Sequence, residues 1–190
     1  RGELAKCLAE LGNIHLSQGA LEPAGRHLSA ALEIFEQLQY PFGIASTLNS
    51  LADVLRKQGL PTEAELGYRR AERICAQVGS PERAVILLNL GLLLLERGDH
   101  AAARGPLQEG MAIVAEGGRR HFQAYFCVAL MVCAAAALRW DAWDRLADDA
   151  EDLLAETGVC DSDIAAPAQQ AAVLAAAAGD RGRARRAYDI

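Results

Sequence analysis

The chain has 190 residues, of which 52% are hydrophobic, 23% are charged and 5% are aromatic, and its formal net charge is −6. This much apolar material is enough for a core, whereas the negative charge argues against nucleic acid as the main partner, because phosphate binding needs a basic surface. We therefore expect a folded protein without a nucleic-acid partner.

A short phrase recurs along the chain. It reads LGNIHLSQG at residues 11–19, LADVLRKQG at 51–59 and LGLLLLERG at 90–98, so that the copies begin 40 and 39 residues apart. Self-similarity at a fixed period of this length predicts an array of repeated supersecondary units rather than a conventional globule. Arrays of this kind present surfaces to partners.

Each repeat is predicted to be helical. Apolar residues recur at three- and four-residue spacing in every segment, and no segment shows the sustained alternation of a strand. Glycine suits the left-handed position that follows a helix. We expect turns near Gly19, Gly59, Gly98, Trp140 and Gly179.

Other residues are typical of helix starts. Pro61 and Pro81 suit the first turn of a helix, where proline loses no hydrogen bond. Pro106 lies deeper inside its expected helix, so we expect a late start or a kink there. Side chains that can cap the following helix are those of Asp99, Asp141 and Asp180.

The second half of each repeat has its own pattern. Five residues after the turn glycine comes an alanine, then a bulky residue four later and a small residue three later. The first three copies are Ala24, Leu28 and Ala31; Ala64, Tyr68 and Ala71; and Ala103, Leu107 and Gly110. Weaker copies are Leu146, Ala150 and Leu153, slipped by one residue, and Ala184 with Tyr188.

These spacings resemble the tetratricopeptide repeat, in the long variety of about 40 residues that occurs in bacterial multidomain signalling and regulatory proteins. The resemblance covers essentially the whole chain. It implies an all-α, right-handed superhelical solenoid of about five helical hairpins, the last one truncated. One domain is expected over residues 1–190, with repeats at approximately 5–44, 45–83, 84–125, 126–164 and 165–190.

Both ends of the chain look cut. The sequence opens at Arg1 already in helical register with Leu4 and Leu8, and it stops at Ile190 partway through the last expected helix. We therefore expect a fragment of a larger protein, whose final helix exposes the apolar side of Ala184 and Tyr188. Self-association through this truncated repeat is a further expectation.

Residues that would carry catalysis or bind a cofactor are lacking. The five cysteines, an odd number, form no C-x-x-C pair, which fits reduced thiols in a cytoplasmic protein, and we expect them to act as buried small hydrophobes. No histidine has a second ligand at metal-ligand spacing. The glycines recur at the expected turns of the repeats and do not form a phosphate-binding loop. We predict no enzyme activity, no cofactor and no metal. The cysteines are Cys7, Cys75, Cys127, Cys133 and Cys160.

Three segments have alternative interpretations. The apolar run at residues 124–138 is shorter than a membrane span of about 20 residues, so it is expected to be the buried first helix of the fourth repeat. Two charged clusters are expected to be solvated helix faces rather than docking patches. They are Arg181, Arg183, Arg185 and Arg186, and the acidic run Asp144, Asp148, Asp149, Glu151 and Asp152.

Two classes of function fit a repeat array. One is a non-catalytic scaffold that binds a peptide or helix of another protein in its concave groove. The other is a regulatory or oligomerisation arm of a multidomain bacterial signalling protein, such as a kinase, ATPase or transcriptional regulator, that packs on its own domains. In both classes the partner is a protein or peptide, and neither requires a membrane.

A partner site is predicted on the first helices of the middle repeats. The third repeat carries a second apolar stripe, which either lines the groove or packs against adjacent first helices. The fourth repeat could extend this stripe, and polar residues of the second repeat would flank it. The residues are Leu88, Asn89, Leu92 and Leu95; Leu130, Met131 and Leu138; and Asn49, Asp53, Arg56 and Lys57.

Overall fold

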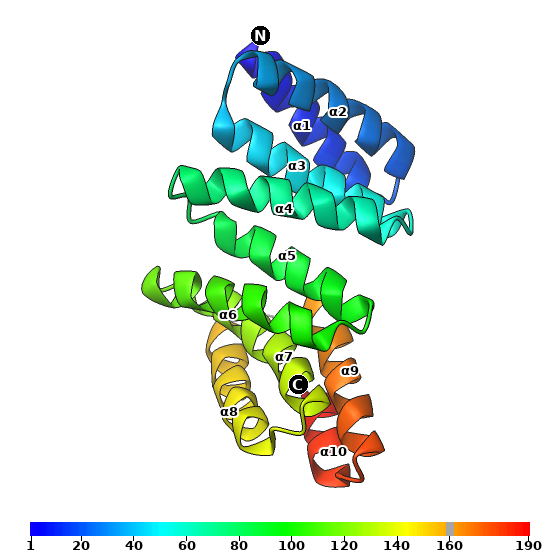
Figure 1. Cartoon of the computed structure of the whole chain (residues 1–190), viewed down its shortest axis with the longest axis vertical. Helices are drawn as coiled ribbons and strands as arrows, with labels where there is room; N and C mark the ends of the chain where they lie inside the picture. Colours follow the sequence, from blue (N-terminus) through cyan, green and yellow to red (C-terminus); the bar gives the residue numbers. More distant parts are fainter. Residues whose placement is uncertain (159–161) are drawn as a thin grey trace. The chain divides into compact units, whose positions relative to one another are not determined.

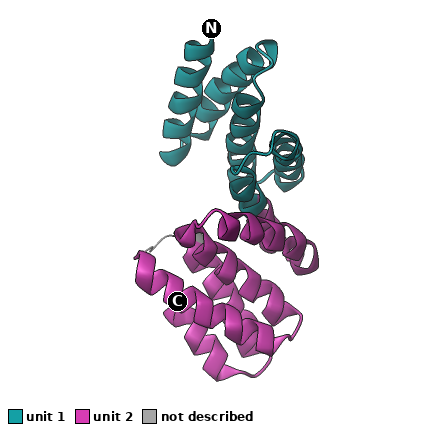
Figure 2. Cartoon of the chain, turned by 90° about the vertical axis from the view of Figure 1, so that its left-hand side faces the viewer, with its two compact units in different colours: residues 1–89 teal, residues 90–190 magenta. Residues whose placement is uncertain are grey.

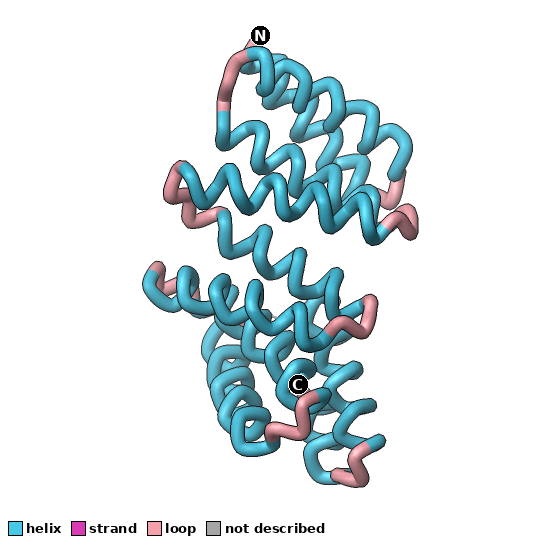
Figure 3. Tube along the Cα trace, viewed as in Figure 1, coloured by secondary structure: helices cyan, strands magenta, loops and turns pink. Residues whose placement is uncertain are grey.

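The computed structural model describes residues 1–158 and 162–190. Within these ranges every regular element is an α-helix (Figures 1 and 3), so the all-α prediction is confirmed. The helices are α1 (Gly2–Ser17), α2 (Leu21–Gln37), α3 (Pro41–Lys57), α4 (Pro61–Gln77), α5 (Arg83–Glu96), α6 (His100–Glu116), α7 (Arg120–Ala136), α8 (Trp140–Thr157), α9 (Ser162–Ala177) and α10 (Arg181–Asp189).

Consecutive helices pack as hairpins. Helix α1 packs on α2, α3 on α4, α7 on α8 and α9 on α10. Helices α5 and α6 meet where the side chain of Leu107 lies against Gly91. The five predicted hairpins are therefore present, and the last is the shortest because α10 ends at Asp189.

A left-handed residue closes every hairpin, at the predicted glycine in four of them and two residues before the predicted Trp140 in the fourth, where Trp140 begins α8. The turn glycines Gly19, Gly59, Gly98 and Gly179 have φ angles of 75°, 77°, 77° and 85°. In the fourth hairpin the equivalent residue is Leu138, whose φ is 53°. The sequence pattern is weakest at this repeat because leucine replaces the glycine that marks the other turns, although a side chain in this conformation costs about 1–2 kcal/mol.

The predicted helix starts are only partly correct. Pro61 begins α4 as expected, but α5 begins at Arg83, two residues beyond Pro81. Helix α6 begins at His100 and contains Pro106 in its interior, so the prediction of a late start is wrong. Pro106 has no N–H to donate to the carbonyl oxygen of Ala102, yet the helix continues without interruption to Glu116.

Of the three expected caps, one is made by a side chain. The Asp180 carboxylate accepts a hydrogen bond from the backbone N–H of Arg183 at 3.0 Å. Asp99 occupies the N-cap position of α6 without a side-chain hydrogen bond, and Asp141 lies inside the first turn of α8.

The tightest helix crossing in a hairpin joins a glycine to a leucine. A Cβ atom at Gly12 would lie 2.6 Å from Cγ of Leu28, and one at Gly91 would lie 2.4 Å from Cδ2 of Leu107. Real Cβ atoms do not approach so closely, so only glycine allows these helices to pack at this distance.

In the fourth hairpin the small residue of the crossing is on the second helix and the large residue is on the first. Met131 stands 40 residues after Gly91, and Ala147 stands 40 residues after Leu107. Both are fully buried. The large residue has therefore moved from the second helix to the first, and the volume of the crossing is kept. Trp143, also fully buried, replaces the alanine of the other hairpins.

This exchange corrects the pattern predicted for the fourth repeat. The buried series on α8 is Trp143, Ala147, Ala150 and Leu153, whereas Leu146 is only half-buried. Because Leu138 takes the place of the turn glycine, the series begins five residues after it, as in the other hairpins. The one-residue slip was therefore wrong.

The chain divides into two compact units, coloured separately in Figure 2. Unit 1 is Arg1–Asn89 and unit 2 is Leu90–Ile190, so the boundary falls inside α5. In unit 1, Ala24 and Leu28 of α2 form a buried cluster with Val54 of α3. Helix α2 thus covers its own first helix and the first helix of the next hairpin.

Unit 2 is built around α7. This helix is the apolar segment of the sequence analysis, and its residues 126–135 are all buried, as expected. No helix in the described part of the chain is long and apolar enough to cross a membrane. Helix α9 packs on α7, and the amide nitrogen Nε2 of Gln170 donates to the carbonyl oxygen of Leu95 at 3.1 Å. Helix α9 therefore reaches the end of α5 as well.

Candidate functional site

The predicted polar residues of unit 1 come together on α3 and its neighbours. The side-chain amide of Asn89 donates to Oδ1 of Asn49 at 3.0 Å. The Tyr68 hydroxyl donates to Oδ1 of Asp53 at 2.5 Å, and Nη2 of Arg56 lies 3.6 Å from the same oxygen. Lys57 is exposed. These residues form a half-buried, internally bonded strip with one exposed cation.

The predicted apolar stripe is mostly enclosed. Leu92 is 7% exposed and Leu95 is 2% exposed, while Leu88, Leu130 and Met131 are also buried. Leu138 is 63% exposed because it occupies a turn. The sequence left two interpretations open for this stripe, groove or core, and burial of the leucines favours the core.

The enclosure of Leu95 has an identifiable cause. Gln170 of α9 donates to its carbonyl oxygen and lies 3.2 Å from Nε2 of His100. Helix α9 is far away in the sequence, and no residue pattern near Leu95 indicates its approach. Sequence reasoning therefore could not choose between groove and core.

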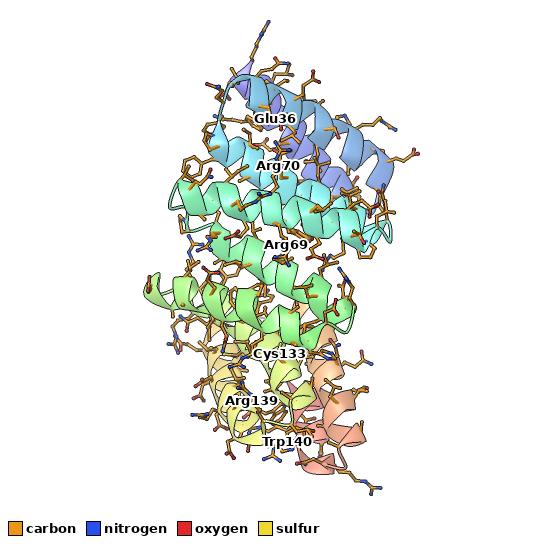
Figure 4. All side chains as sticks on the ribbon, viewed as in Figure 1. Glu36, Arg69, Arg70, Cys133, Arg139 and Trp140 are labelled. Carbon is orange, nitrogen blue, oxygen red and sulfur yellow. The ribbon has the colours of Figure 1, made fainter. Side chains whose placement is uncertain are left out.

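The cleft of about 890 Å³ in unit 1 was not predicted. It lies between the second helices α2 and α4, with α3 as its floor, and we call it the α2–α4 cleft. Beyond its far end an ion pair joins the two helices, with Arg70 Nη2 2.5 Å from Glu36 Oε1 (Figure 4). The lining residues are Leu21, Glu22, Gly25, Arg26, Ser29, Leu48, Leu51, Ala52, Val54, Leu55, Gln58 and Gly67.

Two glycines inside helices line this cleft, and they differ in role. A Cβ at Gly67 would lie 3.0 Å from Cβ of Ala52, so Gly67 lets α4 approach α3 closely, whereas Gly25 leaves room in the cleft. Gly25 and Gly67 have helical backbones and stand at no turn. The nearest atom to a Cβ at Gly25 would be Cγ1 of Val54, at 3.8 Å, which is ordinary contact. Because glycine in a helix interior costs roughly 0.5–1 kcal/mol relative to alanine, its presence was the sequence signal for this cleft.

The α6–α8 cleft of unit 2 occupies the equivalent place, between second helices and above α7. It measures about 450 Å³. Five of its nine lining residues stand 79 positions after lining residues of the α2–α4 cleft; among them Arg104 replaces Gly25, and Leu146 replaces Gly67. The lining residues are Arg104, Gln108, Leu130, Cys133, Arg139, Ala142, Arg145, Leu146 and Asp149.

The cysteines differ in environment. Cys75, Cys127 and Cys133 are buried, as expected, but Cys7 is exposed on α1, so that prediction was wrong for this residue. Burial raises the pKa of the Cys127 thiol to about 12 and that of Cys133 to about 11. These thiols stay protonated at neutral pH. Cys160 lies outside the described residues.

The two charged clusters of the sequence bind each other. Arg183 of α10 donates from Nε and Nη2 to the two carboxylate oxygens of Asp144 at 2.7 and 2.6 Å, and it also pairs with Asp180. Arg186 donates to Asp148 and Glu151, each at 2.6 Å. The clusters are therefore not simply solvated faces, and we call this set the α8–α10 ionic contact.

Two histidines that are 12 residues apart in the sequence lie side by side in the structure. The rings of His15 and His27, on α1 and α2, stack with centroids 5.2 Å apart. Nδ1 of His27 lies 2.8 Å from the carbonyl oxygen of Pro23. In the described residues no group of three histidine, cysteine or acidic side chains is placed to hold a metal ion.

Comparison with known proteins finds similar repeats in sequence and in structure. A family profile described as tetratricopeptide repeat matches residues 43–116. No curated protein sequence matches the chain. The structure of BtubC (BKLC) from P. vanneervenii has 20% sequence identity and a TM-score of 0.78, and the match covers 99% of this chain and 78% of that one.

Two further solved structures are similar. A Rap protein complexed with competence and sporulation factor is 14% identical with a TM-score of 0.75, over 99% of this chain and 62% of that one. YrrB, described as a TPR protein with an unusual peptide-binding site, is 18% identical with a TM-score of 0.63, over 96% and 84%. Residues 43–116 therefore match the tetratricopeptide repeat in sequence, and the whole chain has the fold of tetratricopeptide-repeat structures.

Proposed function

We propose that this chain is a non-catalytic interaction scaffold that binds an apolar segment of a partner peptide or helix in the α2–α4 cleft. The main observation that supports this proposal is the cleft itself, which is about 890 Å³ in volume and has Leu48, Leu51 and Leu55 in its lining. Ligand sites are mostly apolar, with a few polar groups for orientation. Glu22, Arg26 and Gln58 supply those groups here.

The fold comparisons support a peptide partner. YrrB has a described peptide-binding site, and the Rap protein was solved with a bound factor. The polar strip of Asn49, Asp53 and Arg56 does not line the α2–α4 cleft, and with Lys57 and Asn89 it remains a second proposed contact surface. A cytoplasmic location is proposed from the free thiols at the described cysteines.

The proposal is tested by filling the cleft. In Gly25→Leu the new Cβ makes only an ordinary contact with Val54, and leucine is a better helix former than glycine, so the thermal midpoint should stay unchanged or rise. A phage-displayed peptide library is selected on the unmodified protein, and the enriched peptides are measured by fluorescence anisotropy. We expect Gly25→Leu to weaken their binding by roughly tenfold or more, since one buried apolar side chain contributes about 1.5–3 kcal/mol.

Glu33→Leu is the matched control, because it adds the same side chain at an exposed position of α2 outside the cleft. Peptides that bind both variants equally well, or a library without enrichment, would contradict a peptide site in this cleft.

A specific observation also favours the alternative, an arm that packs on other domains or on a second copy. Leu4, Leu11 and Ile14 of α1 are exposed large hydrophobics, and Cys7 between them is exposed too. They share one face at three- and four-residue spacing. At the other end, Tyr188 of α10 is exposed as predicted, whereas Ala184 is half-buried. Self-association through the last repeat remains a proposal.

A further inference from the structure

Three arginines converge on the α6–α8 cleft. Arg104 comes from α6, Arg139 from the turn before α8, and Arg145 from α8 itself. Arg139 and Cys133 are labelled in Figure 4. The equivalent α2–α4 cleft has a single arginine, Arg26, which pairs with Glu22 at 3.7 Å. The cationic lining is therefore particular to unit 2.

These guanidinium groups are poorly neutralised. In the described part of the chain, Arg104 and Arg139 have neither an ion pair nor a hydrogen bond from their side chains. Arg145 donates from Nε to the backbone oxygen of Asp141 at 3.1 Å. Asp149 is the one acidic residue in the lining, so three positive charges face one negative charge.

The surroundings make this unusual. The chain has a net charge of −6, and most other arginines of unit 2 are paired: Arg120 with Glu156, Arg183 with Asp144, and Arg186 with Glu151. An acidic partner is repelled by the molecule as a whole but attracted to this cleft. The positive charge of the cleft therefore both strengthens binding of an acidic partner and directs that partner to this cleft.

The floor of the cleft is apolar. Leu130 and the Cys133 thiol of α7 line it, and Ala142 and Leu146 of α8 extend the apolar surface up one wall. Arg104 and Arg139 line the same cleft as that thiol, and both act to lower its pKa against the larger effect of burial. A ligand here meets positive charge at the rim and apolar surface beneath it.

We propose that the α6–α8 cleft binds an acidic segment of a partner protein in which a carboxylate side chain neighbours a large apolar one. Arg104 and Arg139 receive the carboxylate, because the planar guanidinium matches its two oxygens in a bidentate pair. The apolar side chain lies on Leu130 and Leu146. This site is separate from the α2–α4 cleft and shares no residue with it.

The test uses a fluorescein-labelled peptide of alternating aspartate and leucine as the probe, with the full chain. We expect binding to weaken steeply with added salt, and to weaken roughly tenfold or more in Arg104→Gln with Arg139→Gln, since each charge-assisted bond is a strong one. A peptide of alternating asparagine and leucine should bind the unmodified chain no more tightly than the aspartate–leucine probe binds the double arginine variant. Arg181→Gln is the control, because Arg181 is exposed on α10 outside the cleft.

Two competition arms separate the sources of affinity. An aspartate–serine peptide that binds as well as the aspartate–leucine probe, or displacement of the probe by millimolar inorganic phosphate alone, would indicate a plain anion site and overturn the peptide assignment. Equal binding by the arginine variants and the unmodified chain would overturn the site itself. Gly25→Leu should leave this probe unaffected, so failure here is distinguishable from failure of the proposed function.

Discussion

Single residues determine how closely the two helices of a hairpin approach. Gly12 and Gly91 allow Leu28 and Leu107 to lie where a Cβ atom would stand, whereas in the fourth hairpin Met131 and Ala147 divide the same volume in the opposite way. The hydrophobic core thus depends on the sum of two facing residues rather than on either residue alone.

This pairing predicts a strong coupling between Gly91 and Leu107. Gly91→Met overfills the crossing and should cost about 1–3 kcal/mol, and Leu107→Ala should cost about 2–5 kcal/mol. The double variant reproduces the fourth hairpin, so we expect it to lose about 1–3 kcal/mol less than the sum of the two. Urea denaturation in a double-mutant cycle measures this.

The control for that cycle combines Gly91→Met with Val114→Ala. Val114 is buried on α6 but is not among the atoms that approach Gly91. Additive losses in both cycles would show that the exchanged sizes are unrelated to each other.

Among the helices, α10 depends most on charge. It has nine residues, and Ala187 is its one buried side chain in the described structure. Its remaining attachment to α8 is ionic, and the Arg183 guanidinium stacks at 5.2 Å over the Trp140 ring. Such a contact should be more sensitive to pH and salt than the apolar crossings are.

The pH dependence of α10 has a definite sign. The hydrogen bond from Arg183 holds the pKa of Asp144 below its usual value, and the backbone N–H of Arg183 does the same for Asp180. Because the folded-state pKa is the lower one, the contact is fully present above the unfolded pKa of about 3.9 and is lost as the pH falls through the folded value.

We therefore expect the α10 amides to exchange hydrogen faster below about pH 4, while those of α7 keep their protection relative to the intrinsic rate. Arg183→Met should produce the same effect at neutral pH, and Arg181→Met should not. Loss of protection in both helices together would mean that α10 does not detach independently.

The faces of α1 and α3 offer a second test among the helices. Ile14 is 51% exposed, whereas Val54, its equivalent 40 residues later, is 2% exposed because α2 covers it. Ile14→Glu should change the free energy of unfolding by about 0.5 kcal/mol or less. Val54→Glu should cost several kcal/mol, since it buries an unpaired carboxylate. Equal losses in guanidinium denaturation would show that α1 is already covered.

The sequence predicted local features better than distant ones. Turns at Gly19 and Gly98 and the buried α7 were predictable because each is written in a short stretch of sequence. The contact of Gln170 with Leu95, 75 residues apart, was not, and it decided where the predicted apolar stripe lies. Likewise, the sequences of α8 and α10 taken separately are typical of solvated charged helices, and only the structure shows that their charges pair with each other.

For the whole molecule, the division into two units bears on how the chain opens. In a repeat array most contacts join neighbouring hairpins. The bond from Gln170 of α9 to Leu95 of α5 skips one hairpin but stays inside unit 2, so a defect in one unit should spread mainly within that unit. The fully buried Trp143 lies well inside unit 2, and α1 to α3 lie inside unit 1. The two regions should therefore respond differently to the same substitution.

Trp143→Ala should cost about 3–5 kcal/mol of local stability. We expect hydrogen exchange followed by mass spectrometry to show faster exchange across α7 to α10, with α1 to α3 unchanged. Tyr68→Ala, a buried residue of unit 1, gives the reciprocal control. Uniform acceleration along the chain in either variant would indicate one cooperative unit.

The exchanged residues of the fourth hairpin also constrain how such a gene can change. Duplication or recombination that joins the first helix of one hairpin to the second helix of another is tolerated among copies that face glycine with leucine. A crossover between α7 and α8 would instead set Met131 against a leucine or leave Ala147 facing a glycine, giving a clash or a void. The fourth hairpin can therefore be inherited only as a complete unit, with the crossover points that involve it confined to the loops on either side of it.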